Sequence, residues 1–507
     1  MLLWLLSQKI ICTAYFLDHI RNFRDFLSNE SLPSLNRKHA AVSAFQLYSN
    51  TTILNNAGSQ IGEFSQSLQA PLSWSESWAL RDKKMTKSKF ELEFNAVLVQ
   101  INISCGNVCF ELGPLHSIAC CGEIIRSATR MNFSTAAEAT LEITPFKTHK
   151  LDNAPAQQVT ITRDEAMQYL REMLLVRRME TTASNMYKEK QIRGFCHLYS
   201  GQEAVAVGMK AAMNEDDSVI TAYRCHGWSL LSGITLKQVF AELAGRVSGA
   251  VYGKGGSMHM YNAKQHFYGG CAIVGAQIPL GTGIAFAYKY RDEKRVSFCL
   301  YGDGASNQGQ LYESLNMAKL WHLPCVFICE NNGYGMGTSV ERSSASTEYY
   351  TRGDYVPGLW VNAMDVLAVR QATKWVGEYC REGNGPIVLE MATYRYFGHS
   401  MSDPGTSYRT REEIQKVRKL RDPITSFREK ILSANLATEE ELKNMEKQVR
   451  KEVEKALAEA LQDPEPPIEL LYTDVYKETP DLVLRGTSAD VVVPMPNNLT
   501  VDILKSQ

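Results

Sequence analysis

The sequence predicts an α/β fold in which helices flank a mainly parallel sheet and a helical region follows at the C-terminus. Three observations support this prediction. A strand–helix–strand pattern occupies residues 296–329, glycines concentrate in turns between residues 245 and 358, and a charged helical pattern follows residue 409. Because strands joined by a crossover helix lie parallel, such a sheet carries helices on its faces.

The composition is that of an ordinary globular protein. Of the 507 residues, 44% are apolar and 21% are charged, and the formal net charge is −1. This balance gives no electrostatic reason to expect a nucleic-acid partner. No stretch reaches the ~18 apolar residues of a membrane-spanning helix, so no membrane span is expected. Twelve cysteines without a Cys-x-x-Cys pair indicate reduced thiols.

The N-terminal part differs in composition from the rest. Residues 1–124 are rich in Ser and Asn without sustained periodicity, which predicts an atypical and poorly ordered extension. The segment 125–155 begins with Arg126 and Arg130 among Ser, Thr and Ala, and its first acidic residue after these is Glu138. This composition is typical of a mitochondrial transit segment, with a plain linker as the alternative.

Residues 156–410 are expected to form the main α/β domain. Thr162 and Glu165 have the spacing of a capping box, which predicts that a helix begins there. Four further elements stand out, namely a strand, a helix and two more strands, at 296–301, 310–321, 324–329 and 388–396.

Residues 411–507 are predicted to be a helical C-terminal region with a tail. Thr438 and Glu441 form a second capping box before a charged helical pattern. The proline-rich stretch 463–467 ends that helix, because proline lacks the backbone N–H that a helix needs.

Two polar side chains follow neighbouring strands of the predicted sheet. Asp303 and Asn332 are 332 − 303 = 29 positions apart, about one crossover, so both should emerge at the carboxyl edge where α/β sheets bind ligands. Mg²⁺ prefers hard oxygen ligands together with phosphate oxygens. The Asp303 carboxylate, the Asn332 amide oxygen and the backbone carbonyl of Tyr334 therefore form a candidate magnesium site. A helix expected after Gly304 would offer its N-terminus to phosphate.

Other phosphate-binding motifs are absent. Residues 253–258 (GKGGSM) do not fit the P-loop pattern, and residues 302–307 (GDGASN) lack the third glycine of a dinucleotide fingerprint. An ATP- or NAD-binding enzyme is therefore the less supported alternative.

The Asp303…Asn332 pattern resembles the signature of thiamine-diphosphate enzymes. Over roughly residues 160–475 the sequence closely resembles the α subunits of the pyruvate type of 2-oxo acid dehydrogenase E1 component, of the mitochondrial kind. The phrases that carry this resemblance are RGFCHLYSGQEA (193–204), TAYRCHG (221–227), GKGGSMHMY (253–261), IVGAQIPLG (273–281), YGDGASNQGQ (301–310), ENNGYGMGTSVER (330–342) and YRYFGHSMSDPGTSYRTREEI (394–414). The branched-chain subunits, a second alternative, share GDG…NN but not GMGTS or GHSMSDPG.

The resemblance implies a thiamine-diphosphate-binding fold and the oxidative decarboxylation of pyruvate in the mitochondrial matrix. It implies thiamine diphosphate and Mg²⁺ as cofactors, with transfer of the acetyl group to lipoamide of the E2 acyltransferase core. It also implies that the chain is active only with an E1 β subunit, in an α2β2 heterotetramer, and that a dedicated kinase and phosphatase regulate it.

The resemblance also implies roles for single residues. His399 and His197 are expected to be catalytic. The expected cofactor contacts are Tyr223, Arg224, Ala272, Val274, Asp303, Gly304, Ala305, Asn332 and His399. The expected substrate contacts are His197, Tyr223, Arg224, Ala263, Ala272 and Val274. The expected phosphorylation sites are Ser400, Ser407 and Ser339, and phosphate on Ser400 would add about −1.5 to −2 charges beside the magnesium diphosphate.

The sequence departs from the family pattern beside the cofactor. Cys271-Ala272 stands where pyruvate-type subunits carry Asn-Gly, and 262–266 looks like an insertion. This departure leaves open a non-catalytic subunit that regulates the same complex. The intact Asp303 and Asn332 pair favours the enzyme.

Overall fold

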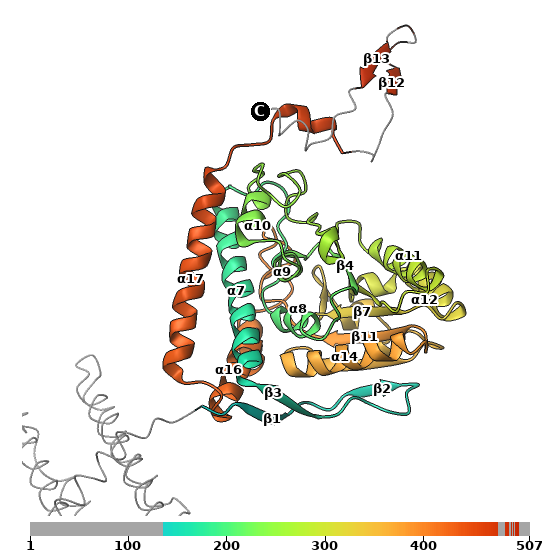
Figure 1. Cartoon of the computed structure of the whole chain (residues 1–507), viewed down its shortest axis with the longest axis vertical. Helices are drawn as coiled ribbons and strands as arrows, with labels where there is room; N and C mark the ends of the chain where they lie inside the picture. Colours follow the sequence, from blue (N-terminus) through green and yellow to red (C-terminus); the bar gives the residue numbers. More distant parts are fainter. Residues whose placement is uncertain (1–134, 475–481, 486–487, 489, 491, 496–507) are drawn as a thin grey trace, which may run out of the picture. The chain divides into compact units, whose positions relative to one another are not determined.

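A seven-stranded sheet forms the centre of the computed structural model, which describes residues 135–474, 482–485, 488, 490 and 492–495 (Figure 1). All neighbouring strands are parallel except the first pair, which is antiparallel. In spatial order the strands are β2 (Lys147–His149), β10 (Gly358–Asn362), β11 (Ile387–Ala392), β7 (Cys325–Asn331), β6 (Ser297–Gly302), β4 (Ser218–Ala222) and β5 (Phe267–Cys271).

Both faces of the sheet are buried, as expected for parallel strands. In β6, Phe298 and Leu300 belong to one apolar core, while Cys299 and Tyr301 belong to the other. The first core lies against α7 (Arg163–Lys188), α8 (Glu203–Lys210) and α14 (Val366–Arg381). The second lies against α11 (Gln277–Tyr290) and α12 (Gly309–Leu320), which Figure 1 shows together beyond the sheet. The predicted α/β class is confirmed.

The predicted strand–helix–strand unit is confirmed within two residues at each end by β6, α12 and β7. Two details differ. The strand predicted over 388–396 ends at Ala392, because after Thr393 the chain leaves the β7 ladder and Tyr396 N donates instead to Ser200 O at 3.1 Å. The segment after Gly304 is a single 3-10 turn (Ala305–Asn307), and the α-helix begins only at Gly309.

Two strands lie inside 125–155, for which a transit-like segment and linker are predicted. β1 (Glu138–Glu142) pairs antiparallel with β3 (Gln158–Thr162), and β2 extends the main sheet. Residues 138–142 and 147–149 of this segment are therefore paired strands. The predictions for residues 1–124, and for Arg126 and Arg130, lie outside the described residues.

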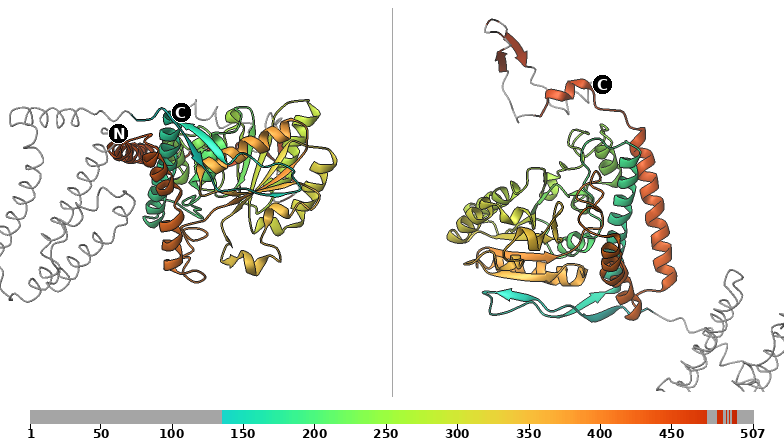
Figure 2. Two further views of the ribbon diagram at one scale, coloured as in Figure 1. Left: turned by 90° about the horizontal axis from the view of Figure 1, so that it is seen from below. Right: turned by 180° about the vertical axis from the view of Figure 1, so that it is seen from behind.

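Both predicted capping boxes are confirmed. Thr162 caps α7, and Thr438 caps α17 (Glu439–Gln462). The two long helices lie side by side (Figure 2) and are joined by ion pairs such as Arg171–Glu452 at 2.6 Å. Among the described residues, the remaining elements of four residues or more are α9 (His226–Leu231), α10 (Leu236–Leu243), α13 (Val340–Ser343), α15 (Arg411–Arg421), α16 (Pro423–Ser433), the 3-10 helix Ile468–Tyr472, and the antiparallel pair β12 (Leu482–Arg485) and β13 (Val492–Met495).

Within the described ranges, no helix combines the length and the apolar character needed to cross a bilayer.

Candidate cofactor site

Four parallel strands deliver the predicted site residues to one edge of the sheet. Tyr223 follows β4, Ala272 follows β5, Asp303 follows β6 and Asn332 follows β7. Since parallel strands end on the same side, these residues lie at the carboxyl edge, where ligands of such sheets bind.

Asp303 is the residue that most clearly calls for a ligand. It is 2% exposed, and its Oδ2 atom is buried without a hydrogen bond from any described residue. Burial raises the pKa of Asp303 to about 6, against backbone N–H contacts and the charge of Arg395 that lower it. A buried carboxylate oxygen without a partner costs free energy unless a cation or donor meets it. The donor set around Asp303 therefore fits a hard divalent cation.

The loops of β6 and β7 meet beside this carboxylate. Asn332 is 8% exposed, and its Oδ1 accepts from Tyr334 N at 3.4 Å. A Cβ added at Gly335 would lie 3.3 Å from the Cα of Gly304 and 3.9 Å from Asp303 Oδ2. The two glycines thus allow the backbone around Tyr334 to approach Asp303, as a shared ligand site requires.

The carbonyl of Tyr334 is held by a residue that the sequence reasoning missed. Arg395, which is almost fully buried, donates to Tyr334 O at 3.0 Å, to Met336 O at 2.7 Å and to Tyr408 OH at 2.9 Å. A carbonyl oxygen has two lone pairs, so this bond still allows a second contact. Arg395 lies in the phrase 394–414 that carries the family resemblance, which was the signal that could have found it, but no role was predicted for it.

Three aromatic rings form a cluster near the strand edge. The ring centroids of His197 and Tyr223 are 4.4 Å apart, and those of His197 and His399 are 5.2 Å apart. Arg224 donates to Leu198 O at 2.6 Å and to His399 O at 2.9 Å, so it joins the two loops that carry the histidines. The structure thus brings together four of the predicted residues from three separate segments.

Both histidines are neutral at physiological pH. Burial, followed by the charge of Arg224, lowers the pKa of His197 to about 2 and that of His399 to about 4. Neutral imidazoles can donate or accept a proton in a hydrogen bond, and they add no positive charge that would compete with a metal.

We expect His399→Asn to flatten the acid side of the stability profile. The folded chain binds fewer protons than the unfolded chain between pH 6.5 and 4, because His399 titrates lower when folded. Stability from neutral His399 is therefore present above pH 6.5 and lost as the pH falls through that window. Melting temperatures of the cofactor-free protein at about pH 7 and about pH 5 should differ less in the variant than in the wild type. An equal difference would contradict this expectation.

The other predicted residues are placed less centrally. The loop of Ala272 and Val274 lies near the start of α12, where Gln310 Nε2 donates to Val274 O at 3.5 Å. Ala263 is not brought together with the others. It lies before β5, where His266 O accepts from Val219 N at the beginning of β4, so it is at the amino edge of the sheet.

The three predicted phosphorylation sites surround the same loops. Ser339 pairs with Tyr334 in a short antiparallel ladder, β8 (Tyr334–Gly335) with β9 (Thr338–Ser339). Ser400 is 5% exposed, and its hydroxyl lies 2.8 Å from that of Ser402. Ser407 is exposed.

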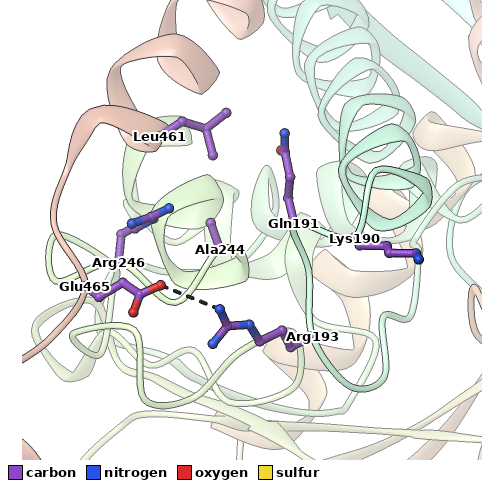
Figure 3. Close-up of a pocket in the computed structure, with 7 residues that line it drawn as sticks. All are labelled: Lys190, Gln191, Arg193, Ala244, Arg246, Leu461 and Glu465. Atoms are coloured by element: carbon purple, nitrogen blue, oxygen red, sulfur yellow. Dashed lines mark ion pairs between the residues drawn. The ribbon is translucent and has the colours of Figure 1, made fainter. Parts of the chain in front are cut away.

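A pocket elsewhere in the molecule contains none of these residues. Figure 3 shows the ion pair between Arg193 and Glu465, at 3.6 Å, and Lys190 pointing away from it. The charged groups do not converge on one point, so the pocket is not a competing site. Its lining is Lys190, Gln191, Arg193, Ala244, Arg246, Leu461 and Glu465.

The parallel sheet, with a buried acid and an amide at adjacent strand ends, places this chain in the class of α/β proteins that bind ligands at the carboxyl edge of the sheet. Comparisons with known proteins are more specific. The family model described as Dehydrogenase E1 component matches residues 171–469. The chain is 63% identical over 371 residues to the probable pyruvate dehydrogenase E1 component subunit alpha, mitochondrial, of Caenorhabditis elegans, over 73% of this chain and 93% of that relative.

Two further relatives agree. The type II α subunit of Ascaris suum is 64% identical, over 70% of this chain and 91% of its own length. The human somatic form is 54% identical, over 70% of this chain and 90% of its own length. The chain therefore belongs to the dehydrogenase E1 component family, among the α subunits of mitochondrial pyruvate dehydrogenase. The predicted family and its thiamine-diphosphate-binding fold are confirmed, and the family implies thiamine diphosphate as cofactor.

Proposed function

We propose that this chain supplies the diphosphate- and magnesium-binding half of the active site of a pyruvate dehydrogenase E1 component. The buried Oδ2 of Asp303, which accepts no hydrogen bond from a described residue, carries the proposal. Asp303, Asn332 and the Tyr334 carbonyl would hold Mg²⁺. The backbone at Gly304 and Ala305, with Arg224, would hold the diphosphate.

Thiamine diphosphate, when bound, supplies the electron sink for decarboxylation of pyruvate. The protein's own groups orient the reactants and exclude water. His197, Tyr223 and His399 provide a partly buried aromatic wall in which the two imidazoles are neutral hydrogen-bonding partners. Of the substrate contacts expected from the resemblance, Ala263 has no support in the fold, while Ala272 and Val274 remain proposed contacts.

A β subunit completes the site in this proposal, within an α2β2 heterotetramer. Apolar side chains stay exposed around the β5 loop and on α11, among them Ile273 at 73%, Val274, Leu280 and Phe286. Exposed large apolar side chains on neighbouring elements favour a protein partner. Lipoamide of the E2 core accepts the acetyl group, which feeds acetyl-CoA formation in the mitochondrial matrix. The mitochondrial names of the relatives support this location.

Phosphorylation of Ser400, Ser407 and Ser339 by a dedicated kinase, reversed by a phosphatase, is the proposed regulation. The placement of Ser400 beside His399 and of Ser339 opposite Tyr334 supports it. Added negative charge at either position would lie close to the proposed magnesium diphosphate.

Co-expression with a matching β subunit tests the proposed function. The complex is expected to release CO₂ from pyruvate only when both thiamine diphosphate and Mg²⁺ are present. A heterotetramer that assembles but releases no CO₂ under these conditions would instead favour a regulatory, non-catalytic subunit.

A further inference from the structure

A directed chain of hydrogen bonds lies behind the candidate metal ligand Asn332. Asn332 Nδ2 donates to Gln202 Oε1 at 3.1 Å, and Gln202 Nε2 donates to Glu330 Oε1 at 3.1 Å. Tyr199 OH donates to the same Glu330 oxygen at 2.6 Å. All four side chains are buried, so their hydrogen bonds are shielded from bulk water and their geometry is well defined.

An asparagine that binds a cation must present its oxygen and not its nitrogen. The two ends of an amide have nearly the same shape, so packing alone does not choose between them. At Asn332 the contacts choose, because Oδ1 accepts from Tyr334 N while Nδ2 donates to Gln202. If the Asn332 amide were flipped, its Nδ2 would face the donor Tyr334 N, and its Oδ1 would face the acceptor Gln202 Oε1.

Gln202 has the same ambiguity, and Glu330 resolves it. Glu330 Oε1 accepts from both Gln202 Nε2 and Tyr199 OH, and an ionised carboxylate has no proton to donate. Gln202 therefore turns Nε2 toward Glu330 and leaves Oε1 for Asn332. Glu330 therefore fixes which end of the Gln202 amide faces it, and Gln202 in turn fixes which end of the Asn332 amide faces Gln202.

We propose that Gln202 and Glu330 are positioning residues that hold Asn332 with its Oδ1 toward the bound magnesium ion. This inference rests on the proposed function, since it needs a metal beside Asp303. Replacing outer partners of metal ligands typically weakens metal affinity about 10- to 100-fold, and the same range is expected for Gln202→Met.

The experiment measures Mn²⁺ binding by electron paramagnetic resonance, with the co-expressed α–β complex and thiamine diphosphate. Mn²⁺ takes the same oxygen ligands as Mg²⁺. Gln277→Met is the matched control, because Gln277 is also buried and donates to Leu300 O of β6 at 2.9 Å, outside the hydrogen-bonded chain behind Asn332. Gln202→Met should lose Mn²⁺ affinity, and Gln277→Met should retain it.

A double variant separates positioning from packing. Gln202→Glu combined with Glu330→Gln keeps both side-chain sizes and the total charge. Position 202 still accepts from Asn332, and position 330 now donates to position 202, so the bond between 202 and 330 reverses while Asn332 keeps its orientation. Mn²⁺ affinity should recover toward the wild-type value in the double variant. Glu330→Gln alone should bind Mn²⁺ weakly, because the amides at positions 332, 202 and 330 and the Tyr199 hydroxyl can then all reverse their donor and acceptor roles together.

Wild-type Mn²⁺ affinity in Gln202→Met, or a double variant as weak as Glu330→Gln, would overturn the inference. If Gln202→Met does not assemble, the second comparison decides by itself. A wild-type complex that shows no cofactor-dependent Mn²⁺ binding would overturn the proposed function instead, so the two failures are distinguishable.

Discussion

Asp303→Asn is expected to abolish magnesium-dependent binding of thiamine diphosphate and to leave the cofactor-free fold at least as stable as the wild type. The wild-type carboxylate is buried with an oxygen that no described residue satisfies. Without a metal it carries a desolvation penalty, which the neutral amide reduces. With a metal it supplies the negative charge that a hard cation needs.

The two effects are measured separately. Calorimetric titration of the α–β complex with thiamine diphosphate and Mg²⁺ should show an affinity lower by on the order of 100-fold or more. Loss of a residue that only supports a metal ligand already lowers metal affinity by up to about 100-fold, and loss of the ligand itself should cost at least as much. Thermal unfolding without cofactor should give an unchanged or higher melting temperature. Unchanged cofactor affinity would remove Asp303 from the metal site.

Asp217→Asn is the matched control for this prediction. Asp217 is also buried, but it is fully partnered by Arg381 at 2.6 Å and by the N–H groups of Val296 and Asn214. Its replacement should lower the free energy of unfolding by about 1–3 kcal/mol, since charged hydrogen bonds are lost. Cofactor affinity should stay near the wild-type value. Asp303→Asn should therefore lower cofactor affinity without lowering stability, and Asp217→Asn should lower stability without lowering cofactor affinity.

Ser400→Asp is expected to inactivate the complex by opening the loop that carries His399. Ser400 is buried, and its carbonyl accepts from Asp403 N, while Asp403 Oδ2 accepts from His399 N at 2.7 Å. A second carboxylate here would be buried beside Asp403. A cost of about 2–3 kcal/mol to the closed loop corresponds to roughly 30- to 150-fold loss of the closed population.

Two measurements follow this change. Pyruvate-dependent CO₂ release should fall by a similar factor, and limited proteolysis should cut within residues 399–409 faster than in the wild type. Ser407→Asp is the comparison variant among the proposed regulatory serines, and a smaller effect is expected because Ser407 is exposed and its replacement leaves a solvated charge. Wild-type activity together with faster cleavage in Ser400→Asp would show that loop opening does not control turnover.

The sequence predicted those parts of the fold that depend on local patterns. The strand–helix–strand unit and both capping boxes follow from periodicity and from residues three apart, and each is confirmed. Asp303 and Asn332 could be placed at one edge because parallel strands end together. The strand β2 could not be predicted, because its three residues pair with β10 about 200 positions later and carry no pattern of their own.

The supporting residues of the site were missed for the same physical reason. Gln202 and Asn332 are separated by 130 positions, and Arg395 reaches Tyr334 across 61. Neither pair shows a sequence spacing that predicts contact, because both depend on how the sheet brings loops together. Glu330 lies just beyond the predicted strand 324–329, but the structure places it within β7, where its carboxylate ends a hydrogen-bonded network. Ala263 was assigned by resemblance alone, and the fold puts it at the other edge.

Arg395 couples the loop that carries Tyr334 and Met336 to the loop that carries Tyr408. One guanidinium holds the carbonyls of Tyr334 and Met336 on the metal side, and it holds Tyr408 on the serine side. A movement of the loop that carries Ser400 and Tyr408 would disturb the contacts of Arg395 with the Tyr334 loop, and a movement of the Tyr334 loop would disturb its contact with Tyr408. Thermodynamic linkage then requires reciprocity. If charge on Ser400 weakens cofactor binding by some factor, saturating cofactor must make the charged loop state less favourable by that same factor, so bound cofactor would oppose the proposed inactivation through Ser400.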